Sequence, residues 1–211
     1  MSITTKPPSL QLLQRAGFPM GGEPSLAVDL ADTVVTVTDP PTDLIADADQ
    51  YQRWWQLQAP RLSVAGEFPV PDLSATRRLR QAIREAFDAH LASTTPLLTS
   101  VDDINAAAAA APMSSRLELR DNALHRSIRW HLEHGGHPWL AAIADDAITV
   151  LTDDQLRGQL RRCANPACSM LFLATNPRRT WCTANICGNR TRAQRHYHQH
   201  HTPKPSPTKH E

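Results

Sequence analysis

Cysteine is absent from the first 162 residues of the sequence, and all four cysteines of the chain fall within the next twenty-five. Long apolar runs are also absent, because no stretch approaches the ~18 to 20 consecutive apolar residues that a membrane-spanning helix needs. The first ten residues lack the cationic and then apolar pattern of a signal peptide. We therefore expect a cytoplasmic protein without a membrane segment.

Recognisable catalytic motifs are missing as well. The sequence contains no G-x-S-x-G, Walker-type or H-E-x-x-H pattern. We therefore assign no catalytic residues and expect a protein that binds a partner, not an enzyme.

The four cysteines form two C-x4-C pairs that are separated by thirteen residues: Cys163, Cys168, Cys182 and Cys187. Two short loops that each present two thiolates can close a tetrahedron around one Zn²⁺. Disulfide pairing is the weaker alternative, because thiols stay reduced in the cytoplasm. The spacing therefore predicts one structural zinc ion bound by these four residues.

Acidic residues are almost absent from the C-terminal quarter of the chain. Residues 157–211 hold ten lysines and arginines and one acid, whereas residues 1–156 hold twelve basic and twenty acidic residues. Zinc with four thiolates removes two positive charges from this C-terminal excess. The asymmetry favours an anionic partner such as nucleic acid, and docking of the basic part on the chain's own acidic domain is the alternative explanation.

The apolar periodicity is mostly helical, and the predicted fold class is α+β. A helix over Leu73–Leu91 is the clearest, and Asp47–Leu57 and Pro138–Leu151 are further candidates. Alternation over Arg116–Leu132 predicts a β-hairpin, and the first cysteine pair lies between two short strands of a small zinc finger. We predict four parts: a flexible lead-in (1–24), a mainly helical domain (25–155), the finger (156–201) and a disordered tail (202–211).

Two segments of the chain resemble known families. WCTANICGNRTRAQRHYHQHH, preceded by CANPACSMLFLATNPRRT, resembles the CGNR zinc finger, which is named for the tetrapeptide Cys187-Gly188-Asn189-Arg190. SLAVDLADT at Ser25–Thr33 and RRLRQAIREAFDAH at Arg77–His90 resemble the ABATE domain, which accompanies this finger in bacterial proteins and is described as a regulator of stress-induced transcription. Where family members commonly have an Asn-Thr pair, this chain has Asp32-Thr33.

The resemblance implies a zinc-binding, DNA-binding transcription regulator. Near the metal, Gly188 permits a tight turn, Asn189 can bond the local backbone, and Trp181 would keep water from the sulfurs. Contacts to phosphates or guanine edges of double-stranded DNA are expected from a basic helix and a neighbouring loop. The residues concerned are Arg178, Arg179, Arg190, Arg192 and Arg195.

Two other kinds of partner stay open. The finger could be a zinc-stabilised module that binds protein and makes no contact with nucleic acid. RNA is a further alternative that the arginine-rich helix allows, although the several exposed aromatic residues expected for stacking on unpaired bases are lacking. We expect the upstream domain to form a homodimer or to sense a small-molecule or stress signal.

Overall fold

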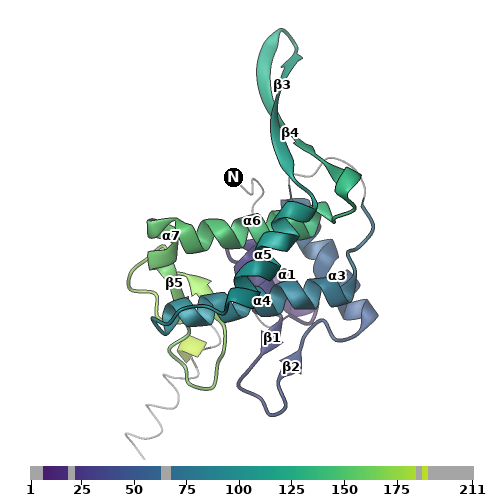
Figure 1. Cartoon of the computed structure of the whole chain (residues 1–211). Helices are drawn as coiled ribbons and strands as arrows, with labels where there is room; N and C mark the ends of the chain where they lie inside the picture. Colours follow the sequence, from purple (N-terminus) through teal and green to yellow (C-terminus); the bar gives the residue numbers. More distant parts are fainter. Residues whose placement is uncertain (1–6, 19–21, 63–67, 184–186, 190–211) are drawn as a thin grey trace, which may run out of the picture.

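The computed structural model describes residues 7–18, 22–62, 68–183 and 187–189. Seven α-helices form its main body (Figure 1): α1 (Leu10–Arg15), α2 (Leu26–Ala31), α3 (Ala48–Gln58), α4 (Leu73–Leu91), α5 (Leu98–Ala110), α6 (Pro138–Thr152) and α7 (Asp154–Gln159). Three antiparallel strand pairs join them: β1 (Val34–Val35) with β2 (Thr42–Asp43), β3 (Met113–Arg120) with β4 (Ala123–Trp130), and β5 (Leu160–Arg162) with β6 (Leu171–Leu173). The fold class is therefore α+β, as predicted. Within these residues no helix is long and apolar enough to cross a membrane.

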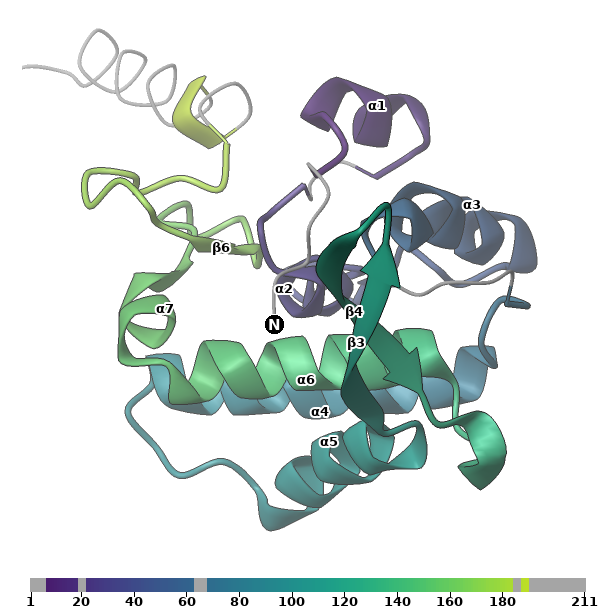
Figure 2. The same ribbon diagram turned by 90° about the horizontal axis from the view of Figure 1, so that it is seen from above.

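Helix α4 lies at the centre of the body and packs against α2, α5 and α6. Its buried side chains Leu79, Ile83 and Phe87 recur every four residues, so one face of the helix enters the core. The helix begins at Asp72, whose carboxylate accepts a hydrogen bond from the backbone N–H of Ala75. Figure 2 shows α4 and α6 side by side along most of their length. The helix predicted over Leu73–Leu91 is confirmed.

Most of the other predicted elements are confirmed too. Helices α3 and α6 match the predicted segments within a residue or two at each end. The predicted hairpin is β3–β4, and it begins three residues earlier than expected, at Met113. Its two turn residues, Asp121 and Asn122, have φ of 48° and 62°. Positive φ at both central positions is what a two-residue hairpin loop requires.

The lead-in over residues 1–24 differs from the prediction, because part of it belongs to the fold. Helix α1 places Leu13 in the hydrophobic core with only 1% of its surface exposed, and Phe18 is buried beside it. Burial of two large apolar side chains outweighs the local proline and glycine composition that predicted flexibility. The tail predicted to be disordered, 202–211, lies outside the described residues.

A buried ion pair fixes the end of this lead-in. The guanidinium of Arg61 lies 2.6 Å from the carboxylate of Asp29, and both side chains are almost completely buried. Burial raises the pKa of Asp29 to about 6, so the group is ionised at neutral pH. Its two oxygens also accept hydrogen bonds from the backbone N–H groups of Gly22 and Glu23. The pair therefore holds Glu23 in place beside the C-terminal part of the chain.

Candidate metal centre

Strands β5 and β6 and the loop between them, residues 160–173, form a knuckle that presents the first cysteine pair. The backbone N–H of Cys163 donates to the carbonyl of Met170, and that of Cys168 donates to the carbonyl of Asn165. The side chain of Asn165 accepts a further bond from the N–H of Ala167. These bonds close a tight turn, and the turn brings the two thiols to the same side of the loop.

The second pair is tied to the first by backbone contacts. The N–H of Ala164 donates to the carbonyl of Thr180, two residues before Cys182. The N–H of Gly188 donates to the carbonyl of Thr183, so the residues that directly follow Cys182 and Cys187 are linked. Gly188 is buried, and the tight turn expected at this residue stays a prediction.

The four sulfurs satisfy the distance requirement for one zinc ion. All lie within 4.8 Å of one another, with Cys168 Sγ 3.7 Å and Cys187 Sγ 3.5 Å from Cys182 Sγ. A tetrahedral Zn–S distance of about 2.3 Å corresponds to sulfurs about 3.8 Å apart. Three of the four cysteines are buried, and Cys168 is partly exposed. The predicted quartet, Cys163, Cys168, Cys182 and Cys187, therefore binds one zinc ion.

The thiols already influence one another's protonation. A hydrogen bond from the Cys182 thiol lowers the pKa of Cys168 to about 5. Burial raises the pKa of Cys187 to about 11. Because a zinc ligand must be a thiolate, binding of the metal releases the protons that remain on the quartet.

A small apolar cluster surrounds the quartet. Met170, Phe172 and Ala174 are buried in it together with the cysteines, and Trp181 packs against its side. Val35 of β1 also packs here, although it belongs to the upstream part of the chain. Trp181 is half-buried and packs against the cluster, and the shielding role predicted for it stays a prediction.

The outer edge of β6 is capped by two carboxylates of the helical body instead of a third strand. Both oxygens of Asp32 accept from the N–H of Leu171, at 2.9 and 3.0 Å. Glu23 accepts from the N–H of Leu173 at 3.1 Å. Burial raises the pKa of Asp32 well above its usual range, and the hydrogen bond from Leu171 opposes that change. The knuckle is therefore held through its backbone by side chains more than 130 residues away in sequence.

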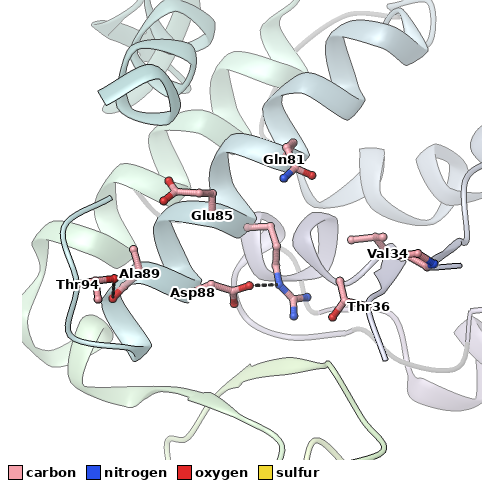
Figure 3. Close-up of a pocket in the computed structure, with 9 residues that line it drawn as sticks. Val34, Thr36, Gln81, Glu85, Asp88, Ala89 and Thr94 are labelled. Carbon is pink, nitrogen blue, oxygen red and sulfur yellow. Dashed lines mark hydrogen bonds and ion pairs between the residues drawn. The ribbon is translucent and has the colours of Figure 1, made fainter. Parts of the chain in front are cut away.

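The loop between the strands is held from the other side by α4 and by Thr36, which follows β1. Arg84, whose side chain is only 4% exposed, donates to the carbonyl of Ser169 at 2.6 Å, and the N–H of Thr36 donates to the Ser169 hydroxyl at 3.0 Å. Asp88 pairs with both Arg84 and Arg162 of β5. These contacts border a pocket of about 570 Å³ between α4 and β1–β2 (Figure 3). Arg84 thus lines the pocket and also binds the knuckle.

Arg179 is partly buried, and its guanidinium is bound within the protein. Its guanidinium pairs with Glu23 at 2.6 Å and donates to the carbonyls of Leu173 and Cys182. It also lies over the ring of Phe172, 4.3 Å from the centroid, in a cation–π contact. The residue predicted to contact nucleic acid therefore joins the two cysteine pairs to the helical body.

The remaining predicted contact residues divide into two sets. Arg178 precedes Arg179 in the same loop and is exposed to solvent. Arg190, Arg192 and Arg195 lie outside the described residues. Asn189 is exposed and follows Gly188.

The fold and the site define a helical domain with an attached four-cysteine zinc finger. The chain belongs to the ABATE family, whose model is described as "putative stress-induced transcription regulator" and matches residues 25–154. The CGNR zinc finger model matches residues 159–200. A comparison with curated proteins finds no match. Both resemblances drawn from the sequence are confirmed.

Sequence reasoning did not identify the residues that hold the finger in place. Glu23, Asp32, Arg84 and Asp88 come from three separate segments, and all four act on groups at least 70 residues away. The only local signal was the Asp32-Thr33 pair, where the family commonly has Asn-Thr. An aspartate there supplies two oxygen acceptors to one backbone N–H, which an asparagine side chain cannot do.

Proposed function

We propose that this protein is a cytoplasmic, zinc-dependent DNA-binding regulator of transcription. Membership of the ABATE family and the presence of a CGNR finger support the proposal. Bound zinc cross-links the two cysteine pairs, and the chain's own residues orient them against the helical body. The finger is thus a fixed platform from which the basic segment after Cys187 can meet phosphates.

The observation that carries this proposal is which of the finger's basic residues pair with carboxylates of the helical body. In the described part of the chain, carboxylates of the helical body pair with two finger arginines, Arg162 and Arg179. Arg178 remains exposed. Five further basic residues follow the last cysteine, with one acid among them: Arg190, Arg192, Arg195, Lys204 and Lys209. These residues lie apart in the sequence from the two arginines that dock, and duplex DNA is an anionic partner that suits their charge.

The test is the affinity of the zinc-loaded protein for random and genomic duplex DNA, measured by fluorescence anisotropy across a salt series. The variant Arg192→Ala with Arg195→Ala should weaken binding and make the slope of log K against log salt shallower by about 2. A control variant, Arg116→Ala with Arg129→Ala, removes the same charge from the β3–β4 hairpin. We expect this control to bind DNA as the unchanged protein does.

A second candidate function is a zinc-stabilised module that binds protein. The docking of Arg162 and Arg179 on Asp88 and Glu23 favours it, because it shows that finger cations can meet acidic protein surfaces. Absence of DNA binding at low salt, with zinc retained, would refute the regulator proposal and support this second one. Equal loss of DNA affinity in both arginine variants would also count against the finger as the contact.

A further inference from the structure

The β3–β4 hairpin, residues 113–130 and called the arm below, projects from the helical body on the side away from β5 (Figure 1). Its two strands pair with each other along eight positions and with no other strand of the described chain. Both therefore have a free edge. A two-stranded hairpin on its own is marginally stable in water and usually needs a surface to cover its apolar face.

The register puts most of the arm's apolar side chains on one face, which also holds Ser115 and Arg126, and a polar face lies opposite. Leu117 lies opposite Arg126, and Leu119 lies opposite Leu124, so three leucines gather on the apolar face near the tip. Their exposed fractions are 69%, 68% and 68% for Leu117, Leu119 and Leu124. Adjacent exposed leucines on a soluble domain mark an interaction surface. The described residues of this chain do not cover them.

A groove lies at the base of the same arm. It has a volume of about 310 Å³ and separates the arm from α6. The arm contributes Met113, Ser115, Arg126 and Ile128 from the leucine-bearing face and Ser114 from the other face, and α6 contributes Asp145 and Thr149. Met113 and Ile128 therefore continue the leucine-bearing face into a groove whose other side chains are polar, with one cation, Arg126, and one acid, Asp145.

The arm and the rest of the upstream region have opposite charge. The arm holds four arginines and two carboxylates, which gives a net charge of +2. The rest of residues 1–156 holds eight basic and eighteen acidic residues, a net charge of −10. Each copy thus has a basic arm that complements the acidic body of another copy.

We propose that two copies of this chain exchange arms. The leucine tip of one arm enters the groove between the arm base and α6 of the second copy, and the second copy does the same in return. Such an interface is isologous, so a two-fold axis closes it and no open chain of copies forms. Asp145 in the groove meets Arg126 of the entering arm, which lies opposite Leu117 on the leucine-bearing face.

A second copy explains the arm better than nucleic acid does. Leucine side chains cannot bind phosphate groups. The arm also points away from the knuckle that holds the zinc site. DNA seated on the finger would leave these leucines exposed. The proposal does not depend on DNA binding, so the two can fail separately.

The test is the solution mass of the full-length, zinc-loaded protein by sedimentation velocity at micromolar concentrations. We expect twice the chain mass of 23.4 kDa. The variant Leu117→Ser with Leu124→Ser should raise the dissociation constant of the dimer at least tenfold, with unchanged circular dichroism and zinc content. The matched control is Leu97→Ser with Leu98→Ser, which alters leucines that are 60% and 74% exposed at the start of α5. This control should stay dimeric.

A photo-reactive residue at position 119 gives an independent readout. In a mixture of isotopically labelled and unlabelled protein, it should form intermolecular cross-links to α6. Three results would overturn the proposal. These are a monomeric unchanged protein at every concentration, a dimer insensitive to the leucine variant, or a monomer whose DNA affinity falls in that variant. The last result would assign the arm to nucleic acid.

Discussion

Replacing Glu23 with alanine removes a carboxylate on which the docking of the finger depends. Glu23 accepts from the N–H of Leu173 at 3.1 Å and from both terminal nitrogens of Arg179, at 2.6 and 3.4 Å. After the change, the buried N–H of Leu173 has lost its acceptor. Arg179 keeps its bonds to two backbone carbonyls, but it loses its ion pair.

The expected cost follows from these two losses. An unsatisfied buried N–H costs about 1–3 kcal/mol. The Arg179 side chain is 31% exposed, so water screens the lost pair, which we count as about 1 kcal/mol. A total of about 3 kcal/mol should lower the unfolding temperature by about 6–12 °C in a chain of this length. Glu23→Gln keeps an acceptor for Leu173 and should cost only about 1 kcal/mol.

The assay combines thermal unfolding of the zinc-loaded protein with the rate at which a chelator removes zinc. Because Arg179 also holds the carbonyl of Cys182, Glu23→Ala should accelerate zinc release as well as lower the unfolding temperature. Glu133→Ala, at a side chain that is 61% exposed, is the matched control and should change neither quantity. If the chelator removes zinc from Glu23→Ala no faster than from the unchanged protein, the docking does not support the metal site.

Three further perturbations test other parts of the structure. Cys187→Ser should release zinc and lower stability in a single calorimetric transition, since β6 belongs to the main core, whereas two separate transitions would show an independent finger. Arg61→Met should cost about 3–5 kcal/mol by leaving the Asp29 charge buried without its cationic partner. A raised aspartate pKa means that the folded state binds the proton more tightly than the unfolded state does. The free energy of unfolding of this variant, measured in urea, should therefore rise from neutral pH down to about pH 5. No rise over that range would contradict this explanation. Gly136→Ala would place a methyl group 2.2 Å from the backbone of α5 and should cost about 1–3 kcal/mol, whereas Gly158→Ala meets nothing within 4 Å and should be neutral or stabilising in thermal unfolding.

The sequence predicted those features that depend on neighbouring residues. Leu79, Ile83 and Phe87 recur at helical spacing after a capping aspartate, so helix α4 could be predicted at both ends. The zinc quartet was equally clear, because its two cysteine pairs lie close together in the chain.

Contacts between residues that are far apart in the chain could not be predicted from the sequence in the same way. Leu13 lies among prolines and glycines, and only the packing of α1 against the core shows that it is buried. Arg179 looked like a cation for phosphate, because its partner Glu23 precedes it by 156 residues. Charge composition indicated that the finger could dock on the upstream domain, but it could not identify which arginines dock.

The carboxylate caps on β6 limit how this finger can be moved between proteins. A fragment cut before β5 would contain all four cysteines, yet the N–H groups of Leu171 and Leu173 would lose Asp32 and Glu23. The detached strand would then offer a free edge to other β-strands and invite aggregation. A chimera that transplants the finger onto another scaffold therefore has to carry the Glu23–Asp32 segment with it.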